Sequence, residues 1–305
     1  MAATTRQLMM RFSGESPAAL QPAAAVGQGS AEDSRLVEIW LHGRSEHTAR
    51  AYRADVDRLR SNLGKPLAAA TLADLQRFAD SLGGAAATRH RTLSAVKSLL
   101  AFGHRLGYLA FDVGRALRLP AVRNRLAERI LSEADLHGIL SLEPNPRNRA
   151  VLALLYASGV RVSELCGLSW RDLQAHGEGG QITVLGKGSV TRSIRIPPSV
   201  WSLVAGLRSP KAGIDDPVFP SRKKKAGGRL RPLAVLRIVR QAAARAGIAG
   251  AVSPHWLRHA HASHALDRGA PIHLVQATLG HASISTTGRY LHARPGDSSS
   301  RFLAI

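Results

Sequence analysis

The chain has 305 residues, which is enough for about two domains. It carries 42 lysine and arginine residues against 21 aspartate and glutamate residues, a formal net charge of +21 at pH 7. Hydrophobic residues make up 45% of the sequence, so this charge belongs to a folded protein and not to a disordered polycation. Both halves of the chain are basic, which indicates a polyanionic partner, most economically nucleic acid bound through its phosphates.

The composition also excludes several classes of protein. The single cysteine, Cys166, rules out an internal disulfide framework and a cysteine-rich zinc module. No apolar run reaches the roughly 18 residues that a membrane-spanning helix requires. The first 32 residues lack the compact apolar segment of a secretory signal, so we expect a cytoplasmic protein without membrane contact.

The N-terminal part of the chain is predicted to be helical after a leader. Residues 1–32 are rich in Ala, Gly, Gln, Ser and Pro with little periodicity, which predicts a flexible leader. Residues 33–112 show helical periodicity and predict a small all-helical domain, with Ser45 as one helix cap and a capping-box pattern at residues 71–74. Some basic residues on these helices are candidate contacts to phosphate, and the alternative is ordinary solvated helix faces. They are Arg50, Arg53, Arg89, Arg91 and Lys97.

The rest of the chain is predicted to form a linker and a second domain. Residues 113–130 hold five arginines around Pro120, a composition typical of a basic linker. Residues 131–305 predict a mainly helical domain in which two β-branched runs, residues 181–185 and 190–196, form a hairpin and hence a small antiparallel sheet. A later loop, residues 221–231, carries a basic run that favours nonspecific phosphate contact. Its members are Arg222, Lys223, Lys224 and Lys225.

The most informative stretch for chemistry runs from Pro254 to His259. Pro254 favours a helix start, so His255 and Arg258 share one helical face near the N-terminus of that helix. Helix N-termini favour anions, an arginine can bind a phosphate with two parallel hydrogen bonds, and a histidine can transfer a proton near neutral pH. Taken alone, the stretch also fits a solvated basic face with a satisfied histidine.

Other candidates are ambiguous one at a time. His281 follows a glycine that can end a helix, and Tyr290 fits a core position as well as a nucleophile. Arg161 and Glu164 follow an apolar helix and fit a surface ion pair. Lys187 lies between two glycines at the hairpin tip, where an exposed lysine is ordinary.

In combination, these residues resemble the tyrosine site-specific recombinases, the phage integrase family. The resemblance covers about residues 130–292, with a weaker match in the preceding helical domain, and looks closest to Xer-like and plasmid- or phage-borne integrases. Residues 259–261 and 288–289 depart from the usual pattern, which affects only the subfamily. The matching residues in chain order are Arg161, Lys187, His255, Arg258, His281 and Tyr290.

The resemblance implies a fold and a mechanism. The expected fold is mainly α with a small antiparallel sheet: an N-terminal helical core-binding (SAM-like) domain and an α+β catalytic domain. Tyr290 would attack a DNA phosphate and form a 3′-phosphotyrosyl link without metal, ATP or another cofactor, with His255 as general base and Lys187 as the acid for the leaving 5′ oxygen. Arg161, Arg258 and His281 would bind the phosphate, and Glu164 would orient the site.

The resemblance also implies partners. The first is double-stranded DNA. On DNA the chain would form either a homotetramer or a heterotetramer with a second recombinase, and it would be associated with the nucleoid. The apolar end of the chain, residues 302–305, would dock on a neighbouring subunit or pack on its own domain.

Three rival functions remain open from the residues. One is a DNA-binding regulator without catalysis, and another is a type IB topoisomerase. The third is a zinc enzyme using the cluster His255, His259, His261 and His264, although no nearby carboxylate supplies a further ligand.

Overall fold

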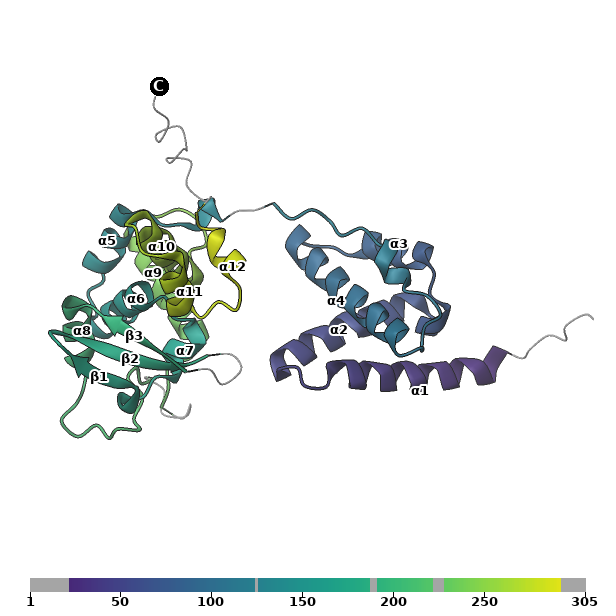
Figure 1. Cartoon of the computed structure of the whole chain (residues 1–305), viewed down its shortest axis with the longest axis horizontal. Coiled ribbons are helices and arrows are strands. Elements are labelled where there is room, and N and C mark those ends of the chain that lie inside the picture. The colour runs from purple at the N-terminus through teal and green to yellow at the C-terminus, as the bar shows by residue number, and fades with distance from the viewer. Residues whose placement is uncertain (1–21, 124–125, 187–190, 222–227, 292–305) are drawn as a thin grey trace, which may run out of the picture. The chain divides into compact units, whose positions relative to one another are not determined.

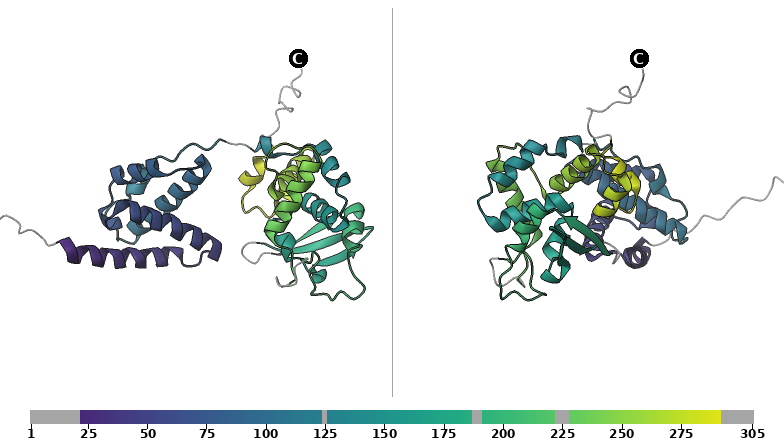
Figure 2. Two further views of the ribbon diagram at one scale, coloured as in Figure 1. Left: turned by 180° about the vertical axis from the view of Figure 1, so that it is seen from behind. Right: turned by 60° about the vertical axis from the view of Figure 1, so that its left-hand side comes forward.

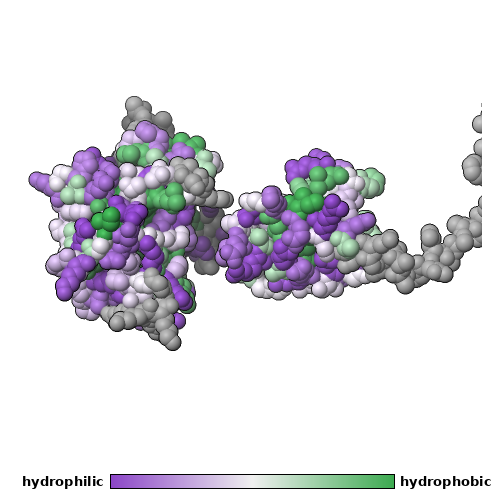
Figure 3. Space-filling view, turned by 90° about the horizontal axis from the view of Figure 1, so that it is seen from below, coloured by the Kyte–Doolittle hydropathy of each residue, from purple (hydrophilic) through white to green (hydrophobic). Residues whose placement is uncertain are grey.

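The computed structural model describes residues 22–123, 126–186, 191–221 and 228–291. The chain divides into two compact units, residues 1–123 and 124–305, and each is described here by itself (Figures 1 and 2). The predicted fold class, mainly helical with a small antiparallel sheet, is confirmed. On the face seen in Figure 3, the surface of each unit is mostly hydrophilic and carries small apolar patches among the hydrophilic residues.

The N-terminal unit is a helical bundle. Its helices are α1 (Pro22–Leu41), α2 (Glu46–Leu63), α3 (Leu72–Ser81) and α4 (Ala86–Arg105), with the short 3₁₀ turns η1 (Leu67–Ala69) and η2 (Val113–Ala116). Ser45 caps α2 and Thr71 forms a capping box with Asp74 at α3, as the sequence predicts. The bundle closes over a core that includes Val56, Leu59 and Phe78, none of which is measurably exposed.

The structure differs from the sequence prediction at both ends of this unit. Helix α1 begins at Pro22, inside the predicted leader of residues 1–32, and its second half buries Leu36, Val37 and Trp40 against the bundle. The predicted linker of residues 113–130 begins too early, because Leu117 and Leu119 belong to the same core and η2 packs on α4. Residues 1–21 lie outside the described residues.

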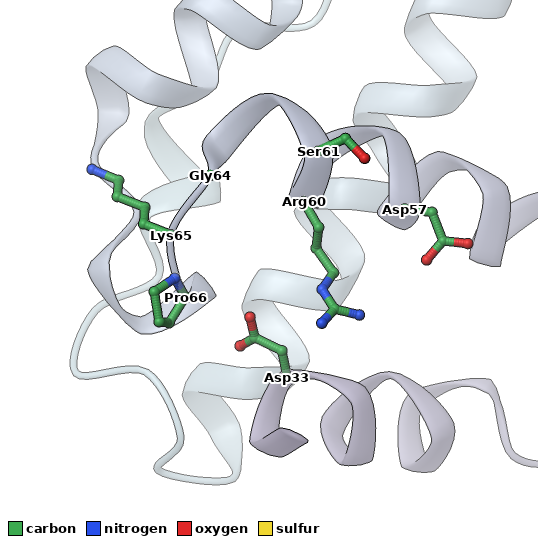
Figure 4. Close-up of a pocket in the computed structure, with 7 residues that line it drawn as sticks. All are labelled: Asp33, Asp57, Arg60, Ser61, Gly64, Lys65 and Pro66. Atoms are coloured by element: carbon green, nitrogen blue, oxygen red, sulfur yellow. The ribbon is translucent and has the colours of Figure 1, made fainter. Parts of the chain in front are cut away.

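One buried carboxylate fastens α1 to the rest of the bundle. Asp33 is only 2% exposed and accepts hydrogen bonds from the backbone N–H of Leu67, at 3.0 and 3.2 Å, and from the Tyr108 hydroxyl at 2.6 Å. Figure 4 shows Asp33 on α1 facing Arg60 and the turn that follows α2, beside a pocket of about 360 Å³. These bonds position α1 more specifically than its apolar stripe alone.

We predict that Asp33→Ala lowers the free energy of unfolding by about 1–3 kcal/mol, because the buried N–H of Leu67 loses its acceptor. Urea unfolding of the full chain, followed by circular dichroism, measures the change. Glu32→Ala is the matched control, since Glu32 is an exposed acid on the same helix. Equal stability of the two variants would contradict the role given to Asp33.

The C-terminal unit surrounds a buried helix with other helices and a three-stranded sheet. The sheet is antiparallel in the order β1 (Leu173–His176), β2 (Gly179–Leu185) and β3 (Thr191–Ile196). The helices are α5 (Glu133–Ser141), α6 (Pro146–Ser158), α7 (Val162–Gly167), α8 (Pro198–Ala205), α9 (Pro232–Arg245), α10 (Pro254–Asp267), α11 (Ile272–Leu279) and α12 (Ile284–Gly288), with short 3₁₀ turns η3 (Ala127–Arg129) and η4 (Trp170–Asp172).

Helix α6 is the centre of this unit. Residues 150–152, 154 and 155 are not measurably exposed, and α6 packs on α8, α10 and β3 (Figure 1). Ser132 caps α5 with a capping box, and Gly159 ends α6 in the left-handed conformation. The hairpin β2–β3 is also confirmed, whereas β1 is short, lacks β-branched residues and has no sequence signal.

Candidate active site

The corner between α6 and α7 positions the first functional arginine. Because Gly159 adopts φ 59°, the chain leaves α6 and starts α7 within three residues, with Arg161 as the N-cap residue. The backbone N–H of Arg161 donates to Glu164 Oε2 at 2.8 Å, and its guanidinium donates to Glu164 Oε1 at 2.9 Å and to the Gly280 carbonyl at 3.2 Å. Its side chain stays 34% exposed, so it can still meet a ligand.

The second arginine reaches the same place from α10. Arg258 is 4% exposed, and its guanidinium donates to the carbonyls of Gly159 and Leu279, the latter at 2.7 Å. Arg161 and Arg258 therefore contact consecutive carbonyls at the end of α11. Burial and the neighbouring charge of Arg161 lower the pKa of Arg258 to about 10, so it remains cationic at neutral pH.

The end of α11 also places His281. Gly280 caps α11 in the left-handed conformation, with φ 64°, as predicted. The Nδ1 atom of His281 lies 2.9 Å from the Thr287 hydroxyl, and its ring stacks parallel to that of Tyr290 with centroids 6.5 Å apart. Burial and the charges of Arg258, Arg161 and Arg192 lower the pKa of His281 to about 4.

Tyr290 follows α12 in a turn and is 6% exposed. It packs in a small apolar cluster with Leu126, Val275 and Leu279. Its hydroxyl lies 2.8 Å from Nδ1 of His259. Burial raises the pKa of the Tyr290 phenol, and the charges of Arg258 and Arg289 oppose this only in part.

His255 lies in the first turn of α10 beside these groups. Pro254 occupies the start of the helix, as predicted, and the His255 ring stacks on that of His259 with centroids 6.2 Å apart. Partial burial and the charges of Arg258 and Arg161 lower the pKa of His255. The sequence predicts His255 as the base for Tyr290, but in this structure the phenol bonds to His259, one helical turn further along α10.

Sequence reasoning missed Arg192 altogether, and it named His259 only as a candidate zinc ligand. Arg192 lies on β3, is 12% exposed, and donates both terminal nitrogens to the Glu164 carboxylate at 3.1 and 2.7 Å. Its Nε donates to the Thr278 carbonyl at 2.8 Å. The period-two pattern of the strand puts Arg192 on the same face as the buried Ile194 and Ile196, a signal that it needs a buried partner.

Glu164 is the carboxylate shared by Arg161 and Arg192, and its side chain is 6% exposed. Burial alone would raise the pKa of Glu164, but the hydrogen bonds from Arg192 and Arg161 and the charge of Arg192 outweigh it, so the pKa lies below its ordinary value of 4.5. With Arg258 included, three guanidiniums gather around one carboxylate. The site therefore keeps an excess positive charge that suits a phosphate.

Some predicted residues lie outside the described part of the chain. They are Lys187, Arg222, Lys223, Lys224 and Lys225. For Lys187, the strands on either side of its loop are described: Val184 pairs with Arg192, and Leu185 pairs with Thr191.

Four of the five basic candidates of the N-terminal unit have partners within the protein. Arg50 pairs with Glu46 on the same helix at 2.6 Å, and Arg53 pairs with Glu38. Arg91 pairs with the buried Asp55 and so joins α4 to α2. Lys97 donates to the carbonyls of residues 115 and 117, at 3.1 and 2.6 Å. Arg89 is partly buried on α4. Contact of these residues with DNA stays a prediction.

The histidines of α10 bond to separate partners. Nδ1 of His261 lies 2.8 Å from the Tyr156 carbonyl, Nδ1 of His264 lies 3.0 Å from the Tyr156 hydroxyl, and His259 bonds to Tyr290. Within the described ranges, no three His, Cys, Asp or Glu side chains are arranged to hold a metal ion. The zinc-enzyme alternative therefore lacks a site in this part of the chain.

Comparison with known proteins assigns the two units. Residues 127–296 match the phage integrase family, and residues 38–107 match the phage integrase N-terminal SAM-like domain. The chain belongs to the phage integrase family. The resemblance inferred from the sequence is thus confirmed, and the integrase is an enzyme that breaks and rejoins DNA.

Similar proteins support this assignment over most of the chain. Tyrosine recombinase XerC of Xylella fastidiosa (strain M23) is 36% identical over 277 residues, covering 85% of the integrase and 92% of the relative. Tyrosine recombinase XerC of Xanthomonas campestris pv. campestris (strain B100) is 34% identical over 291 residues, covering 92% and 89%.

Solved structures share the fold. A lambda integrase (75–356) dimer bound to a COC′ core site has a TM-score of 0.70 at 19% identity. The match covers 88% of the chain described here and 96% of the lambda integrase chain. XerH site-specific recombinase bound to its difH substrate has a TM-score of 0.66 at 18% identity, covering 94% and 89%. In the integrase, none of the helices within the described ranges is long and apolar enough to cross a membrane.

We predict that Arg192→Met destabilises the integrase by up to about 3–5 kcal/mol, because it leaves the buried Glu164 with fewer donors. The stabilisation that depends on ionised Glu164 is complete above pH 4.5 and is lost as the pH falls through the lowered pKa of this group. The difference between wild type and variant should therefore shrink in acid. Urea unfolding at several pH values measures it.

The control is Arg195→Met, on the same strand but exposed, where we expect a change within about 0.5 kcal/mol. The loss of unfolding free energy in Arg192→Lys should lie between those of the other two variants, because lysine keeps the positive charge but lacks the planar guanidinium with its paired donors. A deficit for Arg192→Met that stays constant down to pH 3, about a unit or more below the ordinary glutamate pKa, would contradict the assignment.

Proposed function

We propose that the integrase is a site-specific recombinase in which Tyr290 attacks the scissile phosphate of DNA and forms a 3′-phosphotyrosyl link. The observation that supports this most is the convergence of Arg161 and Arg258 on the end of α11, next to the Tyr290 ring. A nucleophile, two cations and imidazoles thus gather within one small region. In-line attack on a phosphodiester needs these groups together.

The two arginines bind the non-bridging oxygens of the phosphate. Each guanidinium carries five N–H donors, and the bonds to Gly159, Leu279, Gly280 and Glu164 leave others for a ligand. Because they are fixed before DNA arrives, they stabilise the charge that builds up in the transition state without reorganisation. In metal-dependent nucleases a metal ion provides this stabilisation of negative charge.

The remaining groups complete the reaction. The resemblance to the family gives His255 as the acceptor of the phenolic proton, although Tyr290 bonds to His259 in this structure. His281 contributes a further contact to the phosphate, and Lys187 gives a proton to the leaving 5′ oxygen. Glu164 holds Arg161 in place through two hydrogen bonds. The phosphotyrosyl bond conserves the free energy of the broken phosphodiester, so the 5′ hydroxyl of a second strand reverses the step without an external energy source.

The functional partner is double-stranded DNA, held by four recombinase subunits. Supporting this, the similar structures include a lambda integrase dimer bound to a core site and a lambda integrase tetramer bound to a Holliday junction. We expect either four copies of this chain or a tetramer shared with a second recombinase. Residues 302–305 serve as a docking segment between subunits, and the complex acts on DNA in the cytoplasm, at the nucleoid.

We predict that a nicked suicide substrate traps the wild-type integrase in an adduct that survives SDS, and that Tyr290→Phe forms none, because it lacks the nucleophilic oxygen. Arg161→Lys should slow adduct formation by on the order of 10²–10³-fold, since lysine cannot donate the same fork. DNA carrying the target site is first obtained by sequencing fragments trapped on the wild-type protein.

Binding of all variants to the same DNA, followed by gel shift, is the control. An adduct from Tyr290→Phe would contradict the assignment of the nucleophile. Relaxation of plasmid that lacks the target site, without strand exchange between sites, would favour a topoisomerase. Tight binding with no adduct on any substrate would favour a catalytically silent regulator.

A further inference from the structure

The hydroxyl of Tyr290 has a specific partner within the protein. Nδ1 of His259 lies 2.8 Å from it, and the two rings lie 5.7 Å apart at 47°. His259 comes from the middle of α10, whereas Tyr290 follows α12, so the bond joins two elements that are separate in the sequence. The catalytic roles proposed above make no use of His259.

The surroundings of this hydrogen bond set the protonation state of His259. Burial and nearby positive groups lower the pKa of His259 to about 4, so the ring is neutral at pH 7. Those groups are His255 and Arg258 on α10, Arg129 on η3 and Arg289 after α12. The phenol, whose pKa is raised, keeps its proton. We assign the neutral ring as the Nε2–H tautomer, in which the Tyr290 hydroxyl donates the hydrogen bond and Nδ1 accepts it.

We propose that His259 is the group that receives the proton of Tyr290 when the tyrosine attacks DNA and returns it when the strand is rejoined. This inference rests on the proposed function. In the cleavage step the phenolic O–H bond breaks and an Nδ1–H bond forms on His259. At the same time the Tyr290 O–P bond forms, and the P–O5′ bond breaks as Lys187 supplies a proton to the leaving oxygen.

The same pair keeps the DNA-free protein unreactive. With the phenol a weak acid and the imidazole a weak base, the proton stays on oxygen until a phosphate arrives. A bound phosphate brings negative charge to Arg258, which is one of the groups that disfavour a cationic His259. DNA therefore makes the imidazole a stronger base at the moment when Tyr290 must lose its proton.

The position of His255 fits a different role. Its ring is one helical turn nearer the N-terminus of α10, and His259 lies between it and the phenol in the stack of rings. His255 therefore lies at the helix end where a phosphate binds, and His259 lies at the nucleophile. The sequence motif alone does not separate these two roles, because both histidines share one face of the helix.

The test uses full-length integrase with the nicked suicide substrate. His259→Asn is the primary variant, because the Asn side-chain oxygen takes the place of Nδ1 and accepts the phenol hydrogen bond but cannot accept the proton. We expect adduct formation to slow by on the order of 10²–10⁴-fold, the usual contribution of a general base, with DNA affinity unchanged. His259→Gln serves as a second variant if the first proves unstable on thermal melting.

Two further measurements distinguish proton acceptance from simple positioning. The rate of His259→Asn should rise steadily with pH, because phenolate then forms without help, while the rate of His255→Asn should keep the wild-type pH profile at a lower level. A substrate with sulfur in place of the leaving 5′ oxygen needs no acid, since a thiol has a much lower pKa than an alcohol. That substrate should restore the cleavage rate of the Lys187→Ala variant, whereas cleavage by the His259→Asn variant should stay slow.

Several outcomes would overturn the inference. Cleavage by His259→Asn at or above the wild-type rate would show that His259 only restrains the tyrosine. Full rescue of His259→Asn by the sulfur substrate, or a wild-type pH profile in this variant, would likewise exclude it as proton acceptor. Absence of an adduct from the wild-type protein would instead overturn the proposed function, so the two failures are distinguishable.

Discussion

The active site depends on one buried carboxylate. Glu164 accepts hydrogen bonds from Arg161 on its own turn and from Arg192 on β3, and Arg192 in turn donates to the last turn of α11. The corner after α6, the strand that follows the hairpin loop, and the helix before His281 are therefore tied together at one point. Such a buried pair adds little net stability compared with an apolar core, but removing one member leaves a charge without a partner.

This arrangement explains why the site tolerates so much positive charge. Glu164 carries a full negative charge and forms ion pairs with Arg161 and Arg192. Arg258 is instead held by the carbonyls of Gly159 and Leu279, which lie at the C-terminal ends of α6 and α11. Those helix ends carry partial negative charge, enough to orient a guanidinium without neutralising it. Arg258 is thus fixed in position while its charge stays available to a phosphate.

Local sequence signals predicted much of the fold. The Ser45 cap, the capping box at Thr71 and the helix end at Gly280 depend on residues within a few positions of one another, so a single sequence contains them. The start of α1 and the extent of the linker were predicted less well. They are decided by tertiary contacts, such as Asp33 with Tyr108 and the burial of Leu117, that no local pattern contains.

The active site likewise contains residues that the sequence identified and residues that only tertiary contacts reveal. Arg161, His255, Arg258, His281 and Tyr290 were proposed from the resemblance to the tyrosine site-specific recombinases, and the structure brings their elements together around the end of α11. The roles of Arg192 and His259 were missed because their significance lies in what they contact, Glu164 on another element and the Tyr290 hydroxyl.

The contrast between these two residues connects the fold to the chemistry. Arg192 is a cation that meets a full opposite charge, so its contact is permanent and fixes geometry. His259 is a neutral ring among positive groups, and its bond to Tyr290 joins a weak acid to a weak base. Such a bond holds Tyr290, the proposed nucleophile, in place without activating it. In the proposed mechanism a phosphate changes the charge balance around His259 and leaves the Glu164–Arg192 pair intact, so substrate binding alters reactivity without rebuilding the site.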